Sequence, residues 1–462
     1  MKNIAFINPP NAPFTSRGIL IEPIDTLGLA SWTQSLGYET SILDMDVKQL
    51  VPDDLITIYK NNWPSVIVVV FDYHIPLHDV GANKVIKEIC RLAKQNGSIT
   101  ILGGKTATFL ERNRLKENIK ADFYLHFEME NTLKELLSCL YKGEKSFSHI
   151  KGITYWDKDE ISLIDTPERT DKVDIKDLPI CNRNLVDLDD YIDVRTVLSS
   201  RGCNLKCTFC HVPGFWGLWR GRTPEQVVEE LKFLKEHHNA KKVLLLDDNA
   251  FVQPKRLEKV AYGLREQGVD VAWGCLGTID RYNQQSLEIM ASGGFKWIHF
   301  GAESGDNEQL STMGKRITSS KILEAVKGTR ELGIRVRTSW IMDMPGITLD
   351  GLKRTEELIV SQGSEEIRIH FLTLRLGSIL DNQFKIEAPQ FIHNGKQNLN
   401  LSSVSTEEIE KSVERILKEL VKQGYKVVRN ANEFENIQKL KENNPQLKIV
   451  SLCPLRYGLN WI

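Results

Sequence analysis

The feature that most restricts the fold of this chain is a repeated alternation of short apolar runs and helical segments. Over about the first 135 residues, segments with helical spacing end near glycines and separate runs that are rich in β-formers. The run "SVIVVVFD" (65–72) is almost continuously apolar, as expected for a strand that is buried on both faces of a parallel sheet. The alternation predicts an α/β fold, with a Rossmann-like doubly wound parallel sheet over residues 1–139.

A second series of alternating strands and helices begins at residue 194. Six strand-like runs follow one another between 194 and 374, and the helices between them have clear start signals, such as Thr223 before Pro224. Six consecutive β/α units favour a partial (β/α)6 TIM-like barrel over residues 194–382, although the pattern also permits an open sheet.

Two segments lack this alternation. Residues 140–193 are polar, acidic and poorly periodic, which predicts a linker with one small hairpin. In the C-terminal region, residues 383–462, "SVSTEEIEKSVERILKELVKQG" has an apolar stripe and a capping-box pattern from Ser405 to Glu408. We expect this small α-rich or mixed region to pack on the domain beside it.

The composition argues against several classes of protein. The 462 residues include 60 Lys and Arg and 61 Asp and Glu, a formal net charge of −1, and no basic stripe suited to nucleic acid. No apolar run is long enough to cross a membrane, and the segment after Lys2 reaches two prolines before a signal-peptide core could form. We therefore expect a cytoplasmic protein, in which the eight cysteines are reduced and a cluster of them serves metal or redox chemistry.

Three of these cysteines lie close together in "RGCNLKCTFCH" (201–211). Covalent haem attachment at C-x-x-C-H would leave Cys203 unused and normally follows export, and a thioredoxin-like redox pair would also leave one cysteine unused. A structural zinc site needs four ligands, whereas His211 directly adjoins Cys210 and no second C-x-x-C pair follows. A cubane iron–sulfur cluster uses all three, because Cys203, Cys207 and Cys210 would each bind one iron and leave the fourth iron open.

The spacing C-x3-C-x2-C, with Phe209 just before the last cysteine, resembles the signature of the radical S-adenosylmethionine (SAM) enzyme superfamily. The resemblance extends over about residues 194–380. It implies that a 4Fe–4S cluster on the three cysteines binds SAM at its open iron, with Phe209 among the cofactor contacts. It also implies that SAM is cleaved to methionine and a 5′-deoxyadenosyl radical, which abstracts hydrogen from an unactivated carbon.

The same resemblance implies SAM contacts at the ends of the barrel strands. Asp247 and Asp248 occupy the place where the family holds the SAM ammonium group, although they could instead cap the helix that follows. Glu303 and Ser304 resemble the family's contacts to the ribose and amino-acid parts of SAM. Arg337 either pairs with the SAM carboxylate or faces outward from its strand.

Other positions depart from the family pattern or stay unassigned. Asp343 stands where relatives generally have glycine, and Ile347 stands where glutamate is common. The sequence does not fix the residues that act on the substrate, and the candidates are Arg375, His370, His299, Cys275 and Cys453. The two cysteines could supply hydrogen to a product radical or could be ordinary buried, inert thiols.

The N-terminal domain, together with "HVPGFWGLWRGRTPEQVVEEL" (211–231), resembles the radical SAM subgroup that carries a cobalamin-binding domain. The glycine pair in "ILGGKTAT" would let the nucleotide tail of cobalamin approach the backbone, with contacts from Gly103, Gly104, Thr106 and Thr108. A glycine pair is weak evidence by itself, since any tight turn between strand and helix favours glycine.

Two departures leave cobalamin binding open. The lower-ligand pattern D-x-H-x-x-G is absent from its usual place, and "DYHIPLHDVG" (72–81) has these residue types in a distorted order after the third strand. The segment "HFEMENTLKELL" (126–137) lacks the glycines that relatives have in this loop. The domain therefore either binds cobalamin or is a vestigial module that shapes only the substrate cavity.

Three functions follow from these resemblances. The first is a cobalamin-dependent C-methyltransferase in small-molecule or natural-product biosynthesis, with an electron donor such as flavodoxin or ferredoxin. The second is a radical dehydratase, epimerase or other rearranging enzyme that binds no cobalamin. The third is an iron–sulfur or cobalamin sensor without turnover, which the barrel and the acids at its strand ends argue against.

Overall fold

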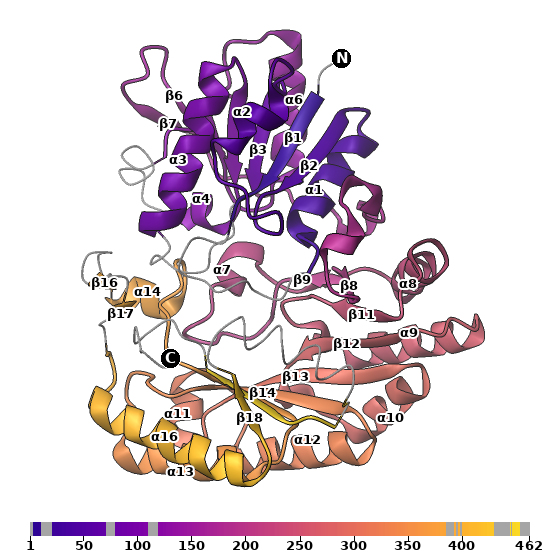
Figure 1. Ribbon diagram of the computed structural model, residues 1–462, viewed down its shortest axis with the longest axis vertical. Coiled ribbons are helices and arrows are strands. Elements are labelled where there is room, and N and C mark those ends of the chain that lie inside the picture. Colours follow the sequence, from indigo (N-terminus) through magenta and orange to yellow (C-terminus); the bar gives the residue numbers. More distant parts are fainter. Residues whose placement is uncertain are drawn as a thin grey trace. The chain divides into compact units, whose positions relative to one another are not determined.

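A computed structural model describes residues 3–10, 21–70, 79–109, 119–384, 392–393, 396–397, 400–428, 444 and 446–452. The chain divides into two compact units. The first contains residues 1–192 and the short segments 214–216 and 375–377, and the second contains the remainder. Each unit is built on a largely parallel sheet with helices, which confirms the predicted α/β class (Figure 1).

The first unit has a seven-stranded sheet in the order β2-β1-β3-β4-β5-β6-β7. Its strands are β1 (Asn3–Asn8), β2 (Glu39–Asp44), β3 (Val66–Val70), β4 (Ile99–Gly103), β5 (Phe123–Leu125), β6 (Ile153–Trp156) and β7 (Leu163–Asp165). Its helices are α1 (Ile24–Ser35), α2 (Asp54–Tyr59), α3 (Asp79–Gln95), α4 (Lys105–Phe109), α6 (Glu130–Lys142) and the 3-10 turns η2 (Ile175–Asp177), η3 (Arg183–Leu185) and η4 (Leu188–Asp190). Strands β1 to β5 are parallel, and the chain changes direction across the sheet between β1 and β3, as in a doubly wound fold.

Alternate residues of the central strands enter two separate cores on opposite faces of this sheet. On β1, Ile4 and Phe6 pack in the core that includes residues of α1 and α6, whereas Ala5 and Ile7 pack in the core that includes residues of α2 and α3. Because both faces of the sheet are covered, every residue of β3 is buried. This explains the unbroken apolar run that predicted the strand.

The segment predicted as a linker, 140–193, is largely part of the first unit. It begins in the last turn of α6, and its hairpin β6–β7 extends the sheet antiparallel to β5. The remaining residues pass through three 3-10 turns to Ile192 within the same unit. The polar composition accompanies the exposure of most residues from 158 to 172, while the open edge of β5 supplies hydrogen-bond partners for the hairpin.

The second unit has an eight-stranded parallel sheet in the order β18-β19-β15-β14-β13-β12-β11-β8. Its strands are β8 (Arg195–Val197), β11 (Lys242–Leu245), β12 (Ala272–Gly277), β13 (Phe295–Glu303), β14 (Arg335–Ile341), β15 (Glu366–His370), β18 (Lys426–Val428) and β19 (Ile449–Leu452), with small ladders of β9 (Ser200–Arg201) and β10 (Arg220–Gly221), and of β16 (Ile392–His393) and β17 (Lys396–Gln397). Its helices and 3-10 turns are α7 (Val212–Trp216, shared with the first unit), α8 (Pro224–His238), η5 (Ala250–Val252), α9 (Pro254–Glu266), η6 (Ile279–Arg281), α10 (Gln284–Ser292), α11 (Asn307–Thr312), α12 (Ser319–Glu331), α13 (Leu349–Ser361), α14 (Ile379–Phe384) and α16 (Thr406–Lys422).

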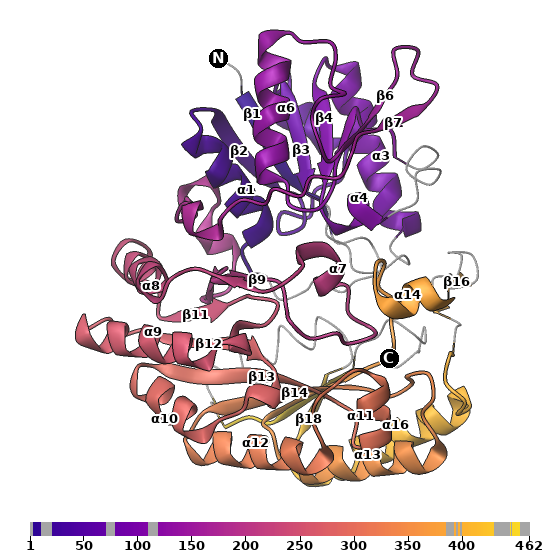
Figure 2. The same ribbon diagram turned by 180° about the vertical axis from the view of Figure 1, so that it is seen from behind.

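From β8 to β15 the order of the strands in space follows their order along the chain, and a helix follows each strand. Figure 1 and Figure 2 both show α9, α10 and α12 along the outer side of this sheet. The arrangement is consistent with the predicted partial barrel of six β/α units.

The C-terminal region is not a separate appendage in the part that the structure describes. Strands β19 and β18 add to the sheet beyond β15, parallel to it. Helix α16 is capped by Ser405, whose side chain accepts a hydrogen bond from Glu408 N–H at 3.2 Å, which is one half of the predicted capping box. Its Arg415 pairs with Glu356 of α13 at 2.8 Å, so the helix lies against the barrel helices.

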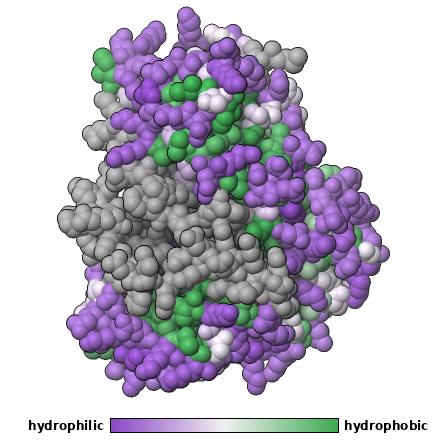
Figure 3. Space-filling model, in the orientation of Figure 1, coloured by the Kyte–Doolittle hydropathy of each residue, from purple (hydrophilic) through white to green (hydrophobic). Residues whose placement is uncertain are grey.

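The surface pattern agrees with this layering. Hydrophilic side chains cover much of the coloured surface in Figure 3, because the apolar stripes of the helices face the sheets.

Thr223 forms a complete capping box with Gln226 at the start of α8, which confirms the predicted helix start. Among the described residues, no helix combines the length and apolarity that a membrane crossing requires.

Candidate cluster site and its surroundings

The three cysteines of the predicted cluster lie in one loop of the second unit, between β9 and α7. The loop is tied to the segment after α11, because Thr208 N–H donates to Met313 O at 3.0 Å. Gly314 has φ +72°, and a Cβ at this position would lie 2.5 Å from Lys206 O. The close approach of the two backbones therefore requires glycine at 314.

The three thiols interact electrostatically. Burial raises the pKa of Cys207 to about 12; Lys315 opposes the rise, and Cys210, Glu303 and Cys203 add to it. A thiol in such surroundings stays protonated unless a bound metal ion displaces the proton. Three cysteines in one loop, with Cys207 close enough to the other two for their charges to interact, are the donor set that a cluster held by three thiolates requires.

Asp248 and Asn249, which follow β11, contact the start of the cysteine loop. Asp248 Oδ2 accepts a hydrogen bond from Gly202 N–H at 3.1 Å, and Asn249 Nδ2 donates to Cys203 Sγ at 3.4 Å. An amide donor on a sulfur orients a metal-bound thiolate and tunes its electron density. No sequence motif singles out Asn249, which reaches Cys203 because β11 pairs directly with β8.

Asp247, which was predicted to contact SAM, supports the loop from within. Its buried carboxylate accepts hydrogen bonds from the N–H and Oγ of Ser199 at 2.6 Å and from Ser200 Oγ at 2.5 Å. Its Oδ2 also lies 3.7 Å from Arg256 Nη2, which donates to Ser199 Oγ at 2.7 Å. Because both oxygens are engaged, the structure gives Asp247 a positioning role for the turn that leads into the cysteines.

Glu303 and Lys315 form a buried ion pair beside the cysteines. Glu303, which was predicted to contact SAM, is the last residue of β13 and has φ +69°, a value that is uncommon for residues other than glycine. Its Oε1 lies 3.3 Å from Lys315 Nζ, and Lys315 also donates to Gly301 O at 2.8 Å. Burial disfavours the charge on Lys315, but Glu303 and Cys207 outweigh it and raise the lysine pKa, so the ammonium stays charged.

Sequence reasoning missed Lys315. In "MGKRI" it resembles an ordinary surface lysine, yet the fold buries its side chain to 6% exposure. A buried lysine requires a partner, and here a strained glutamate and a cysteine surround it. Strained backbone together with buried charges is typical of functional positions, which makes the end of β13 a candidate part of the site.

Ser304 directly follows Glu303 at the end of β13, and Phe209 directly precedes Cys210 in the cysteine loop. Ser304 Oγ lies 3.1 Å from Thr355 Oγ1 and accepts a hydrogen bond from Asp306 N–H at 3.1 Å. The buried hydroxyl thus stabilises the turn after β13, and a SAM contact from it stays a prediction. Phe209 lies half-buried within the cysteine loop.

A row of polar side chains crosses three neighbouring strands. His299 on β13, Arg337 on β14 and Glu366 on β15 are register partners, and Arg337 Nε donates to Glu366 Oε2 at 2.7 Å. His299 Nε2 lies 2.6 Å from Ser339 Oγ. Burial, and then the charge of Arg337, hold the pKa of His299 well below its usual range, so this imidazole is neutral. Arg337 already has a carboxylate partner, with which a SAM carboxylate would compete.

The two departures from the family pattern have structural roles. Asp343 is fully buried, and its Oδ1 accepts a hydrogen bond from Leu372 N–H, which ties the end of β14 to the segment after β15. Ile347 is fully buried in the hydrophobic core. An apolar side chain in this core explains why a glutamate is absent at this position.

The remaining candidates for substrate chemistry are His370, Cys275, Arg375 and Cys453, and they do not form one group. His370 is the last residue of β15 and interacts electrostatically with His299. Cys275 is fully buried, and burial raises its pKa well above the usual value, which favours the inert thiol over a hydrogen donor. Arg375 belongs to a segment that groups with the first unit rather than with the cysteine loop, and Cys453 lies outside the described residues.

In the first unit, the predicted cobalamin contacts follow β4. Gly104 has φ +109°, which favours glycine, but a Cβ on Gly103 would lie 2.1 Å from Met129 Sδ. Met129 therefore packs closely against Gly103 and leaves no room for a side chain at that position. Thr108 Oγ1 donates to Gly104 O at 2.9 Å and accepts from Phe127 N–H at 2.8 Å, so its hydroxyl has a structural role.

Two parts of the cobalamin prediction lie outside the described structure. These are the side chain of Thr106 and the distorted lower-ligand segment over residues 72–78. The cobalamin contacts therefore stay predictions.

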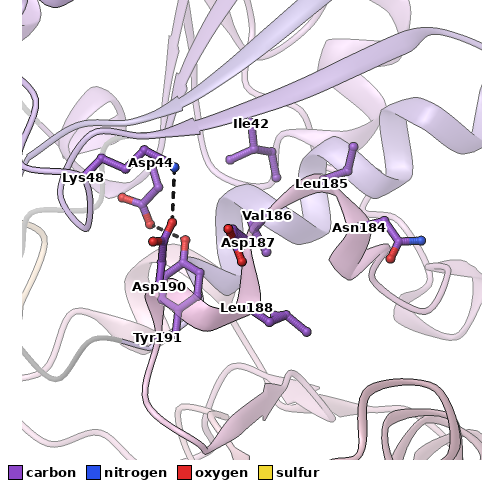
Figure 4. Close-up of a pocket in the computed structure, with 10 residues that line it drawn as sticks. All are labelled: Ile42, Asp44, Lys48, Asn184, Leu185, Val186, Asp187, Leu188, Asp190 and Tyr191. Atoms are coloured by element: carbon purple, nitrogen blue, oxygen red, sulfur yellow. Dashed lines mark hydrogen bonds and ion pairs between the residues drawn. The ribbon is translucent and has the colours of Figure 1, made fainter.

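A separate cavity of about 540 Å³ lies at the carboxyl end of β2 in the first unit (Figure 4). On one side of it Tyr191 donates to Asp44 Oδ2 at 2.8 Å, and Lys48 lies 3.3 Å from Asp190. These four polar side chains thus form two pairs, and the lining residues include none of the predicted cobalamin contacts.

Comparison with known proteins adds a family match. Residues 197–359 match the family model described as the radical SAM superfamily. The chain is also 26% identical over 359 residues to "Uncharacterized methyltransferase PH0819" from Pyrococcus horikoshii, and the match covers 76% of each chain.

Two solved structures have a similar fold. One is the radical S-adenosylmethionine methyltransferase TsrM from Kitasatospora setae with cobalamin and a 4Fe–4S cluster bound, at 16% identity and a TM-score of 0.67 over 82% of this chain and 74% of that chain. The other is the cobalamin-dependent S-adenosylmethionine radical enzyme OxsB with aqua-cobalamin bound, at 21% identity and a TM-score of 0.66. The second match covers 78% of this chain but only 52% of the OxsB chain. Likeness at these identities establishes the fold.

Proposed function

This chain belongs to the radical SAM superfamily, and we propose that it is a cobalamin-dependent C-methyltransferase that acts on a small molecule. The observation that carries the proposal is the grouping of three coupled thiols with a buried lysine and a strained glutamate at the end of a barrel strand. The methyltransferase name of the Pyrococcus relative supports the reaction type, and the two similar folds support the two-part architecture.

The chain's own residues would divide the work around the cluster. Cys203, Cys207 and Cys210 would hold it, and Asn249 would donate its hydrogen bond to the first of these sulfurs. Lys315 would offset the negative charge of the thiolates, since its ammonium lies close enough to perturb Cys207 and Cys210. When bound, the cluster and SAM supply a 5′-deoxyadenosyl radical and cobalamin supplies a methyl group.

Two further parts of the proposal concern partners. The electron would come from a small carrier such as flavodoxin or ferredoxin, because the cluster needs an external one-electron donor. The row formed by His299, Arg337 and Glu366 would supply polar contacts for substrate from the barrel strands. A neutral imidazole beside a paired guanidinium suits hydrogen bonding to a polar group of the substrate.

One observation favours a second candidate, a radical enzyme that rearranges or dehydrates its substrate without cobalamin. The Met129 side chain packs against Gly103, the glycine predicted to let a nucleotide tail approach the backbone, so a tail that enters on this side would have to displace it. A methionine side chain is flexible enough to turn away, so the space can open at a cost in binding energy. The two candidates therefore differ in whether this displacement takes place.

The deciding experiment uses the full-length chain after anaerobic reconstitution with iron and sulfide. SAM, a reductant and hydroxocobalamin are added, and bound corrin, 5′-deoxyadenosine and S-adenosylhomocysteine are measured. Cys207→Ala is the inactive variant, and Cys181→Ala, which removes a cysteine outside the loop, is its matched control.

The methyltransferase requires bound corrin and both nucleoside products in the wild type and in Cys181→Ala, and neither product in Cys207→Ala. Deoxyadenosine without corrin binding would establish the second candidate instead. Failure of the wild type to form either product, with the cluster spectrum present, would refute both.

A further inference from the structure

Three side chains of the first unit bring different metal-ligating atoms together, away from the cysteine loop. Cys139 lies in the last turn of α6, Glu144 follows the helix, and His149 precedes β6. Cys139 Sγ lies 3.5 Å from His149 Nε2, and His149 Nε2 lies 3.9 Å from Glu144 Oε2. All three ligand atoms lie within 4.8 Å of one another.

Backbone hydrogen bonds hold the segments around these residues. Gly143 ends α6 with φ +73°. Glu144 N–H donates to Cys139 O at 3.0 Å, which fixes Glu144 relative to Cys139. Next to His149, Ile150 is fully buried and its N–H donates to Phe147 O at 3.0 Å. The three ligands thus project from hydrogen-bonded backbone, Cys139 at the end of α6 and Glu144 and His149 in the loop that follows it.

The distance between Cys139 and His149 matches the coordination of zinc, whereas the distance between His149 and Glu144 is longer than zinc requires. Zinc–ligand lengths of about 2.3 Å to sulfur and about 2.0–2.1 Å to nitrogen and oxygen give tetrahedral spacings of about 3.6 Å for sulfur to nitrogen and about 3.3 Å for nitrogen to oxygen. The Cys139–His149 distance of 3.5 Å meets the first value. Glu144 is 0.6 Å too far from His149 (3.9 against 3.3 Å), a gap that a rotation of this exposed side chain closes.

The chemistry of the three atoms selects among metal ions. Thiolate, imidazole and carboxylate together suit zinc, whereas calcium and magnesium prefer oxygen ligands throughout. Cys139 is 7% exposed, while the side chains of His149 and Glu144 are 58% and 38% exposed. An ion here would rest on the buried sulfur and keep one position toward solvent.

We propose that Cys139, Glu144 and His149 bind one Zn²⁺, with water as the fourth ligand, and that this ion ties the end of α6 to the loop before β6. The site is independent of the cluster and of the methyltransferase proposal, since it lies wholly within the first unit. Without the ion, burial and then Glu144 raise the pKa of the Cys139 thiol, so zinc has to displace a proton and binds less tightly as the pH falls.

The test counts metal on the full-length protein with its cluster already loaded. The protein is equilibrated with buffered zinc under anaerobic conditions, and iron and zinc are measured by mass spectrometry. We expect about one zinc per chain beside four irons in the wild type, and its loss in His149→Ala and in Glu144→Gln. His237→Ala, which removes an exposed histidine of α8, is the matched control and should keep the zinc.

A second variant separates this site from the cluster loop. The triple variant Cys203→Ala/Cys207→Ala/Cys210→Ala should lose iron and still bind one zinc per chain, with a zinc-dependent rise in melting temperature. The proposal is wrong if zinc persists in His149→Ala, if it disappears only in the triple variant, or if the wild type binds none. The last result would leave Cys139 and His149 as a simple hydrogen-bonded pair.

Discussion

Replacing Lys315 by methionine should destabilise the second unit strongly, because it leaves Glu303 as an uncompensated buried charge. The two charged atoms are 3.3 Å apart, and an effective dielectric constant of about 20 gives an attraction of about 5 kcal/mol. Part of this value is offset by desolvation, and breaking a buried pair by removing one partner costs about 3–5 kcal/mol. We expect Lys315→Met to lower the free energy of unfolding by that amount.

An exposed lysine provides the matched control. Lys321 Nζ lies even closer to its partner, 2.9 Å from Glu324, but the two side chains are 35% and 59% exposed. Water screens this pair, so Lys321→Met should cost no more than about 0.5 kcal/mol. The comparison isolates burial from distance, since the pair with the longer separation is predicted to matter more.

The assay is anaerobic urea denaturation of the full-length chain, followed by tryptophan fluorescence, since Trp273 and Trp340 are buried in the core of the second unit. The double variant Glu303→Gln/Lys315→Met removes both charges and should recover most of the lost stability. If Lys315→Met unfolds within about 1 kcal/mol of Lys321→Met, or if the double variant is no more stable than the single one, the buried-pair argument is refuted.

Three further predictions concern the cluster and the first unit. Gly314→Ala should lower the iron content after reconstitution, because its Cβ meets a backbone carbonyl at 2.5 Å, whereas Gly333→Ala at a similar φ of +71° meets nothing within 4 Å and should keep full iron. Asp247→Asn should cost about 2–4 kcal/mol and reduce iron incorporation, since it removes the charge that holds the turn before the cysteines; an unchanged iron-to-protein ratio would contradict this role. Met129→Gly should tighten corrin binding, measured by equilibrium dialysis with hydroxocobalamin, because it opens the space over Gly103; equal affinity in both proteins would mean that no tail enters there.

Much of the fold could be predicted from the sequence because parallel sheets that are covered on both faces impose a local pattern. The unbroken apolar run of β3 follows from two cores, one on each face. The start of α8 at Thr223 and Pro224 depends on adjacent residues, so it is visible without the tertiary structure. The cysteine spacing is likewise local, which is why the cluster loop was predictable.

Other features depend on contacts between distant parts of the chain. The hairpin β6–β7 and the strands β18 and β19 join existing sheet edges, and their short, partly polar sequences do not specify which edge they extend. Adjacent aspartates 247 and 248 look alike in the sequence, but the first is enclosed by Ser199, Ser200 and Arg256 while the second reaches Gly202. Their different roles follow from which side of the strand end each faces.

The sequence by itself determined the buried parallel strands, the helix starts and the spacing of the three cysteines, because each depends on neighbours within one turn or one strand. Only the tertiary structure decided that Lys315 is a buried cation at Glu303 and that Met129 covers Gly103. Burial sets the strength of an ion pair and the free space beside a glycine. It depends on the residues that the fold brings around an atom, and those residues lie far away along the chain.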